Sequence, residues 1–115
     1  MDKNEEDILL ENAKEYYEGA LEAEKKENYN TSGTLYFKSF ASLLDYYIYL
    51  KKGVIPRSHT DRFRILERDY PDLYKKIDSD FEFYQKSYRE RLTKEACEVL
   101  KKDARELFGL LNIKI

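Results

Sequence analysis

Residues 35–52 have the sequence LYFKSFASLLDYYIYLKK, and this stretch decides the fold. Its apolar and aromatic side chains recur at spacings of three and four, the repeat of one buried face of a helix. Together these side chains form an apolar face that covers most of the helix circumference: Tyr36, Phe37, Phe40, Ala41, Leu43, Leu44, Tyr47, Ile48 and Leu50. Because such a helix has to be surrounded by others, we predict that it is the central helix of a bundle.

The rest of the chain also predicts helices. Only four glycines and two prolines interrupt 115 residues, and no stretch shows strand-like alternation. The expected fold is all-α, an up-and-down bundle of four long helices plus one short helix, in a single domain over residues 1–115. The expected helices cover 5–26, 34–52, 59–68, 71–92 and 94–111.

Recognised signals mark the expected helix ends. Residues 28–33 are expected to form a turn, because Asn, Thr, Ser and Gly offer caps and permissive backbone angles. Gly53 fits a C-terminal cap. Ser58 and Thr93 fit N-terminal caps, and Pro71 fits the first position of a helix.

Composition limits the class of protein. With 42% hydrophobic and 38% charged residues, the chain is expected to be a soluble globular domain. The single cysteine excludes an internal disulfide, and one histidine with one cysteine makes no conventional zinc site, so neither metal nor cofactor is expected. No apolar run is long enough for a membrane span, and the acidic start lacks signal-peptide features. We therefore expect a cytoplasmic protein that does not engage membranes.

The charges are unevenly distributed along the chain. Residues 1–30 carry a net charge of −6 and residues 31–115 one of +4. This asymmetry could produce an acidic and a basic face, while the simpler interpretation is a mixed, solvated surface.

Motifs of catalysis are absent from the sequence, which has no glycine-rich phosphate loop and no HExxH or GxSxG motif. His59 is a candidate general base, but its place beside Ser58 favours a partly exposed residue at a helix start. His59 and Arg62 together form a possible secondary polar site. Cys97 is expected to be a small buried apolar residue rather than a nucleophile.

Two further groups of side chains bear on function. Asp78, Asp80 and Glu82 are expected to be solvated, because alternate residues of a helix cannot converge on one metal ion. The eleven tyrosines suit both a core that reaches the surface and a protein interface. Because tyrosine and leucine exceed what a five-helix monomer should enclose, we predict a homodimer.

The segment YQKSYRER, residues 84–91, carries the strongest signal for a ligand. On a continuous helix it places Tyr84, Tyr88 and Arg91 on one side, with Arg89 displaced. Aromatic rings beside arginines can stack on bases and bind phosphates. The same pattern also suits a solvated, salt-bridged helix end.

The order of these elements resembles the HEPN domain family of bacteria and archaea. The resemblance rests on LxxxSFASLLDYYIYLKKGVIPxSHxxRxxIL over residues 35–66, on YPDLYKKID and YQKSYRERLTKE, and on an amphipathic last helix. It implies a HEPN-like bundle that often pairs as a homodimer. Many members bind a minimal nucleotidyltransferase, as one half of a toxin–antitoxin or substrate-binding pair. Others are ribonucleases with an Arg, four to six residues, then a His.

This chain departs from the ribonuclease motif. Arg89 and Arg91 match the arginine, but the histidine is missing, and Lys94 stands at the shortest spacing after Arg89. We therefore predict a non-catalytic binding module, a partner subunit of a minimal nucleotidyltransferase with a nucleotide- or RNA-facing surface. That surface would comprise Tyr84, Tyr88, Arg89, Arg91 and Lys94. The alternatives are a metal-independent ribonuclease with an unconventional active site and a helical adaptor that binds only protein.

Overall fold

The computed structural model describes residues 4–115, and that range contains five helices and no strand. The helices are α1 (Glu5–Lys25), α2 (Tyr29–Lys52), α3 (His59–Asp69), α4 (Pro71–Lys86) and α5 (Lys94–Leu110). The prediction of an all-α bundle is confirmed. Within residues 4–115, none of the helices combines the length and the apolar character that a membrane span needs.

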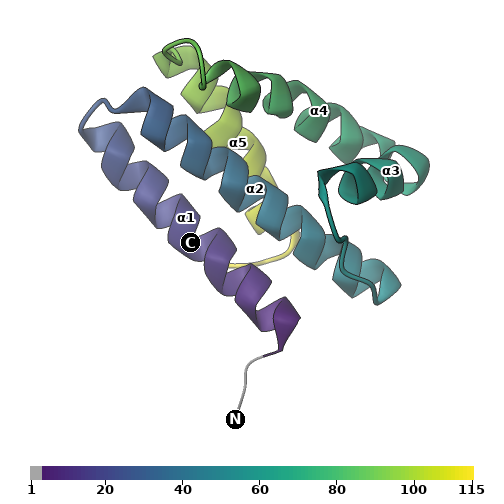
Figure 1. The fold of residues 1–115 in the computed structure, drawn as a ribbon. Helices are drawn as coiled ribbons and strands as arrows, with labels where there is room; N and C mark the ends of the chain where they lie inside the picture. The colour runs from purple at the N-terminus through teal and green to yellow at the C-terminus, as the bar shows by residue number, and fades with distance from the viewer. Residues whose placement is uncertain (1–3) are drawn as a thin grey trace.

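The long helices alternate in direction along the chain (Figure 1). α1 and α2 form an antiparallel pair, and α5 passes behind α2 in this view and packs against it. The short α3 turns the chain back, so that α4 runs along the bundle on the side away from α1. α2 therefore touches both α5 and α4 as well as α1, as expected for the central helix.

The core is built around α2. Tyr36, Phe40, Leu43, Leu44 and Ile48 are completely buried on this helix. From the other helices the core receives Ala13, Tyr17, Ala20, Ile65, Leu66, Ile77, Leu100, Ala104, Leu107 and Phe108. The small residues of α1 let the two helices approach closely, and the ring of Tyr17 packs edge-on against Tyr36 and Phe108.

Three serines of α2 fix the register of the α1–α2 pair. Each hydroxyl donates a hydrogen bond to a backbone carbonyl of α1: Ser32 to Ala20 (2.9 Å), Ser39 to Ala13 (2.6 Å) and Ser42 to Leu9 (2.7 Å). A buried hydroxyl without a partner would be costly, so sliding one helix along the other would break these bonds without replacing them.

Most of the expected helix ends are confirmed. The Ser58 and Thr93 side chains accept hydrogen bonds from the backbone N–H groups of Asp61 and Ala96, both at 3.1 Å. Gly53 ends α2 in the left-handed conformation with φ of 74°, and Pro71 begins α4.

The start of α2 was predicted wrongly. The helix begins at Tyr29 and not after Gly33, and the turn before it is confined to residues 26–28, with Glu27 at a positive φ of 59°. Gly33 is not a turn residue but a buried residue inside the helix. An added Cβ there would lie 2.5 Å from Leu92 and 3.3 Å from both Cys97 and Leu100, so glycine provides space for α5 and the segment before it.

We expect Gly33→Ala to lower the free energy of unfolding by about 1–2 kcal/mol. The methyl group would force the buried side chain of Leu92 to move and would crowd Cys97 and Leu100, and this overpacking outweighs the gain in helix propensity. Gly109→Ala is the matched control, because Gly109 is also helical and its added Cβ meets nothing within 4 Å. Urea denaturation should show a stability change of at most about 1 kcal/mol for this control, in the stabilising direction. A Gly33→Ala protein as stable as the wild type would contradict the close approach.

The end of α4 was also predicted wrongly. The helix ends at Lys86 rather than near residue 92, although the apolar spacing continues. Asn30 explains this difference, because its amide donates to the carbonyls of Ser87 and Glu90, both at 3.2 Å. Its carbonyl accepts from the backbone N–H of Leu92 at 2.5 Å. Asn30 thus satisfies three backbone groups of the 87–93 loop. These bonds to a distant residue favour the loop over a continuation of the helix.

Candidate functional site

A pocket of about 270 Å³ lies where α1, α2, α3 and α4 meet. It is lined by Leu9, Tyr16, Phe37, Lys38, Ala41, Ser42, Asp45, His59, Arg62 and Tyr84. Its volume lies just below the range of about 300–1,000 Å³ that is usual for small-molecule sites in proteins. We call it the four-helix pocket.

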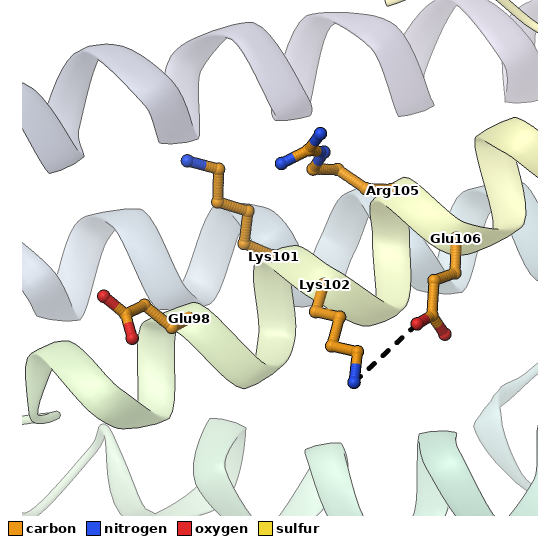
Figure 2. A pocket seen from close by; sticks show the side chains of 5 residues that line it. All are labelled: Glu98, Lys101, Lys102, Arg105 and Glu106. Atoms are coloured by element: carbon orange, nitrogen blue, oxygen red, sulfur yellow. Dashed lines mark ion pairs between the residues drawn. The ribbon is translucent and has the colours of Figure 1, made fainter.

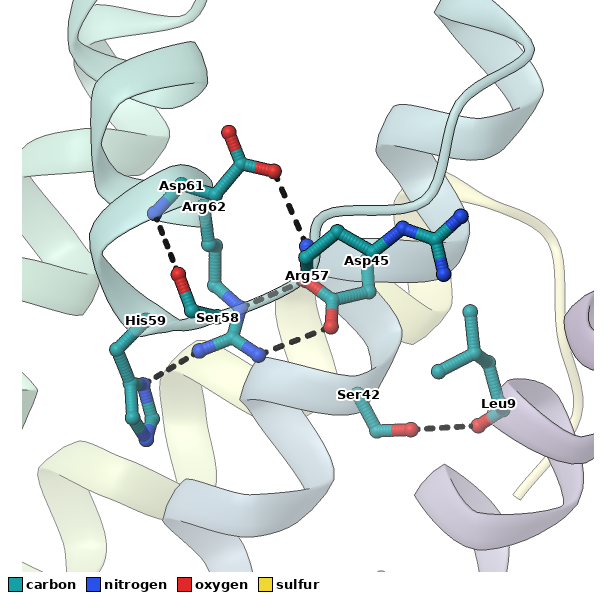
Figure 3. A network of polar contacts seen from close by, with 8 residues as sticks. All are labelled: Leu9, Ser42, Asp45, Arg57, Ser58, His59, Asp61 and Arg62. Atoms are coloured by element: carbon teal, nitrogen blue, oxygen red, sulfur yellow. Dashed lines mark hydrogen bonds and ion pairs between the residues drawn. The ribbon is translucent and has the colours of Figure 1, made fainter.

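A buried ion pair forms its polar wall (Figure 3). Arg62 of α3 donates from Nε and Nη2 to the two carboxylate oxygens of Asp45 on α2, at 2.6 and 2.9 Å. This bidentate geometry is the strongest form of the arginine–carboxylate contact. Because both side chains are about nine-tenths buried, the pair also joins α3 to the central helix.

His59 continues this network. Its Nδ1 lies 2.6 Å from Nη1 of Arg62, and its other ring nitrogen points away from the arginine (Figure 3). The imidazole also packs against Phe81, with ring centroids 5.4 Å apart. Burial lowers the pKa of His59, and the charge of Arg62 lowers it further, while Asp45 opposes the shift. At neutral pH the imidazole is therefore uncharged.

Aromatic rings form another part of the pocket lining. The ring of Tyr84 stacks on that of Phe37, with centroids 4.6 Å apart and planes 16° from parallel. The hydroxyls of Tyr84 and Tyr88 lie 3.1 Å apart, so they share a hydrogen bond. On α1 the ring of Tyr16 lies 6.0 Å from the ammonium of Lys38. The pocket thus combines aromatic faces with cationic side chains.

The structure brings some of the predicted site residues together and separates others. Tyr84 is the one residue of the predicted nucleotide-facing surface that lines the four-helix pocket, where it lies with His59 and Arg62. Tyr88 and Arg89 line a neighbouring open hollow of about 580 Å³. Tyr88 is 74% exposed.

The expectation that a continuous helix carries the other site residues is wrong, although Tyr84 and Tyr88 do lie side by side with their hydroxyls 3.1 Å apart. Tyr88 and Arg91 lie in the 87–93 loop beyond the end of α4, so helical spacing does not place them. Arg91 and Lys94 are exposed and line neither the pocket nor the hollow. Asn30 is the residue that sets the position of this loop.

Of the residues that line the four-helix pocket, the sequence predicts only His59, Arg62 and Tyr84 as site residues, and those it misses include Tyr16, Lys38 and Asp45. Asp45 stands in the middle of an apolar helix, where a carboxylate has to find a partner, and this was the signal that could have identified it. Lys38 and Tyr16 resemble ordinary surface residues of amphipathic helices, and only the packing of α1 on α2 places them together.

A second groove, of about 460 Å³, runs along α5 (Figure 2). Lys101 and Arg105 point toward α1, whereas Lys102 and Glu106 point toward α4. Its lysines are already paired, Lys101 with Glu24 at 3.3 Å and Lys102 with Glu106 at 3.8 Å. The Lys101–Glu24 pair joins α5 to α1 and Lys76–Glu106 joins α4 to α5, whereas Lys102 and Glu106 lie on the same helix.

Two buried titratable side chains, Cys97 and Asp80, do not line the four-helix pocket. The thiol of Cys97 is buried, as predicted, and donates to the carbonyl of Tyr29, and burial raises its pKa to about 11. Asp80 was expected to be solvated, which is wrong: it is 1% exposed, because it faces α5. Across residues 4–115 no group of three or more His, Cys, Asp or Glu side chains could hold a metal ion.

Comparison with known proteins adds no relative. No family model, no curated protein and no solved structure matches the chain.

Proposed function

We propose that the protein is a non-catalytic binding module whose four-helix pocket takes a nucleotide or the end of an RNA. The observation that carries the proposal is the composition of the pocket walls. The partly exposed ring of Tyr84, which is stacked on buried Phe37, lines one part of the pocket, and Lys38 and Arg62 exceed the single carboxylate of Asp45 by one positive charge. A planar base with an attached phosphate matches an aromatic face beside a net positive charge.

The surroundings of the pocket support a longer ligand as well. Tyr84 and Tyr88 are joined through their hydroxyls, and Tyr88 lies beside Arg89 in the neighbouring hollow. Aromatic rings and cations therefore continue from the pocket to the exposed loop. The resemblance to HEPN domains supports the same ligand class and suggests a minimal nucleotidyltransferase as the protein partner.

The test is a titration of ATP and of labelled single-stranded RNA at two salt concentrations. Lys38→Ala is expected to weaken binding of both ligands and to flatten the salt dependence, because one phosphate contact is lost. Tyr88→Ala is expected to weaken RNA binding by about 1–3 kcal/mol, the range for one stacked base, with little effect on ATP. Lys75→Ala is the control, because Lys75 is an exposed lysine of α4 that lines neither the four-helix pocket nor the neighbouring hollow.

Three results decide the matter. If neither ligand binds at submillimolar protein, the nucleotide-facing surface is contradicted for the isolated chain. If Lys75→Ala weakens binding as much as Lys38→Ala, the effect is general electrostatics and not a site. RNA cleavage by the pure protein would instead favour the ribonuclease alternative.

We also propose a homodimer in solution. Several large apolar side chains are exposed in residues 4–115: Ile8, Leu50, Val54, Tyr88, Val99 and Leu110, with Ile115 near the end of the chain. A second copy could cover part of this surface. Light scattering is expected to give twice the 13.8 kDa mass of the chain, and a concentration-independent mass near 13.8 kDa would contradict the dimer.

A further inference from the structure

His59 makes a contact that fixes where its proton sits. The Nδ1 atom lies 2.6 Å from Nη1 of Arg62. A guanidinium has only N–H donors and no acceptor, so Nδ1 has to supply a lone pair. In the neutral imidazole the proton must then be on Nε2, which Figure 3 shows on the far side of the ring from Arg62.

The arginine cannot easily turn away from this contact. Its Nε and Nη2 atoms are bound to both oxygens of Asp45, and the pair is buried. His59 is exposed as a whole residue, but part of its imidazole ring packs against aromatic rings, with centroids 5.4 Å from Phe81 and 6.2 Å from Phe37. Both the ring and its partner are therefore preorganised before any ligand arrives.

The surrounding charges keep the imidazole neutral. Protonating Nδ1 would break its contact with Arg62 and place two cations side by side. Around the pocket the titratable or charged groups are Lys38 and Asp45 on α2, Arg62 on α3, Tyr16 on α1 and Tyr84 on α4. The only carboxylate among them, Asp45, already binds Arg62 with both oxygens and is not free to stabilise an imidazolium.

We infer that His59 is a fixed hydrogen-bond donor in the four-helix pocket, and that it selects ligands that present an unprotonated acceptor, such as a phosphate oxygen, to its Nε2. Arg62 and Asp45 are the positioning residues that maintain this state. The inference rests on the proposed function for the identity of the ligand. It also gives a chemical reason for binding without cleavage, because a nitrogen that already carries its proton cannot serve as a general base.

The first experiment needs no ligand. The chain has a single histidine, so the side-chain ¹⁵N signals of the labelled protein belong to His59 without ambiguity. We expect an unprotonated Nδ1 and a protonated Nε2 at both about pH 7 and about pH 8, and a protonation midpoint below that of a free imidazole. Asp45→Asn frees Arg62 and should give a mixture of tautomers. A proton on Nδ1 in the wild type, or a ring that is doubly protonated at the lower pH, overturns the inference.

The second experiment tests selection. Glutamine carries its amide N–H as far along the side chain as Nε2, and asparagine only as far as Nδ1. His59→Gln is therefore expected to bind AMP within about threefold of the wild type, and His59→Asn to lose at least about tenfold, which is ~1.4 kcal/mol. Adenosine, which lacks the phosphate, should not distinguish the two variants. Equal binding of AMP by both variants overturns the selective role.

These experiments separate the inference from the proposed function. If the wild type shows the fixed tautomer but binds neither AMP nor inorganic phosphate, the nucleotide proposal fails while the assignment of the donor stands. If AMP binds and the tautomer is the other one, the proposed function stands and the inference fails.

Discussion

Asp45→Asn is expected to lower the free energy of unfolding by about 3–5 kcal/mol, the range for removing one partner of a buried ion pair. The substitution keeps the shape of the side chain but removes the charge that both Nε and Nη2 of Arg62 contact. Arg62 would remain largely buried without a counter-charge, and α3 would lose its polar attachment to α2. Equilibrium denaturation in urea measures the change.

An exposed ion pair provides the control. Lys25 and Glu22 are paired at 3.3 Å with both side chains about two-thirds exposed or more, so Glu22→Gln should cost less than about 1 kcal/mol. The double variant Asp45→Leu with Arg62→Met should be more stable than Asp45→Asn, because it leaves no unpaired charge. A loss below about 1 kcal/mol in Asp45→Asn would mean that water reaches Arg62 through the pocket and compensates for the missing carboxylate.

The same ion pair connects stability with the candidate site. Replacing a buried pair with apolar residues often leaves a protein as stable, so stability alone does not account for Asp45 and Arg62. In this protein the pair also fixes the imidazole of His59 at the edge of a pocket. A variant that restores stability without the charges should therefore still lose the fixed tautomer, which separates the two roles.

Local sequence signals predicted much of the fold. The start of α3 follows from the Ser58 cap, that of α4 from Pro71 and that of α5 from the Thr93 cap, and the structure has all three. These signals act within one turn of the chain, so a single sequence contains them. The central position of α2 also followed from its nearly continuous apolar surface.

The errors in the predicted helix ends arise where contacts between residues far apart in the sequence determine the structure. Gly33 suggested a turn, but it lies inside a helix because Leu92 and Leu100 occupy the space of a side chain. The apolar spacing suggested a longer α4, but Asn30 binds the backbone of residues that are 57 and 60 positions away in the sequence. The sequence around residue 87 gives no sign of this contact with Asn30, so the loop could not be predicted from neighbouring residues.

The lining of the four-helix pocket could be predicted only in part for the same reason. Tyr84, His59 and Arg62 were named from aromatic and polar patterns, and they line one pocket. Asp45 was not named, because its partner Arg62 is 17 residues away and on another helix. The chemical state of His59 depends on that pair, so sequence alone could indicate the residue but not its role.

The buried carboxyl group of Asp80, between α4 and α5, is the basis of a second prediction with a large expected effect on stability. Both oxygens of Asp80 are buried, and neither accepts a hydrogen bond from a donor among the described residues. Burial raises its pKa to about 9, the neighbouring Asp103 of α5 raises it as well, and Lys76 of α4 opposes the shift. Lys76 is itself bound to Glu106 at 2.7 Å, and no charged group of α2 contributes to the shift. The folded protein therefore keeps a proton on Asp80 at neutral pH, and that O–H can donate to Asp103.

This proton makes stability depend on pH in a definite direction. Below the ordinary pKa of 3.8 the Asp80 carboxyl is protonated in both the folded and the unfolded chain. As pH rises from there toward about 9, the unfolded chain releases the proton and the folded chain retains it, so the contribution of Asp80 to stability falls progressively. The free energy of unfolding of the wild type should decline over this interval.

Asp80→Asn is expected to remove this decline and to stabilise the protein by roughly 2–4 kcal/mol near pH 7. The amide stays neutral at every pH and still offers an N–H to Asp103. Near pH 4 the variant and the wild type should be almost equally stable, and the difference should grow as pH rises. Asp78→Asn, at an exposed position of the same helix, should change stability by no more than about 0.5 kcal/mol. A wild type whose advantage over Asp80→Asn grows with pH would show that Asp80 is ionised and that an unseen donor compensates its charge.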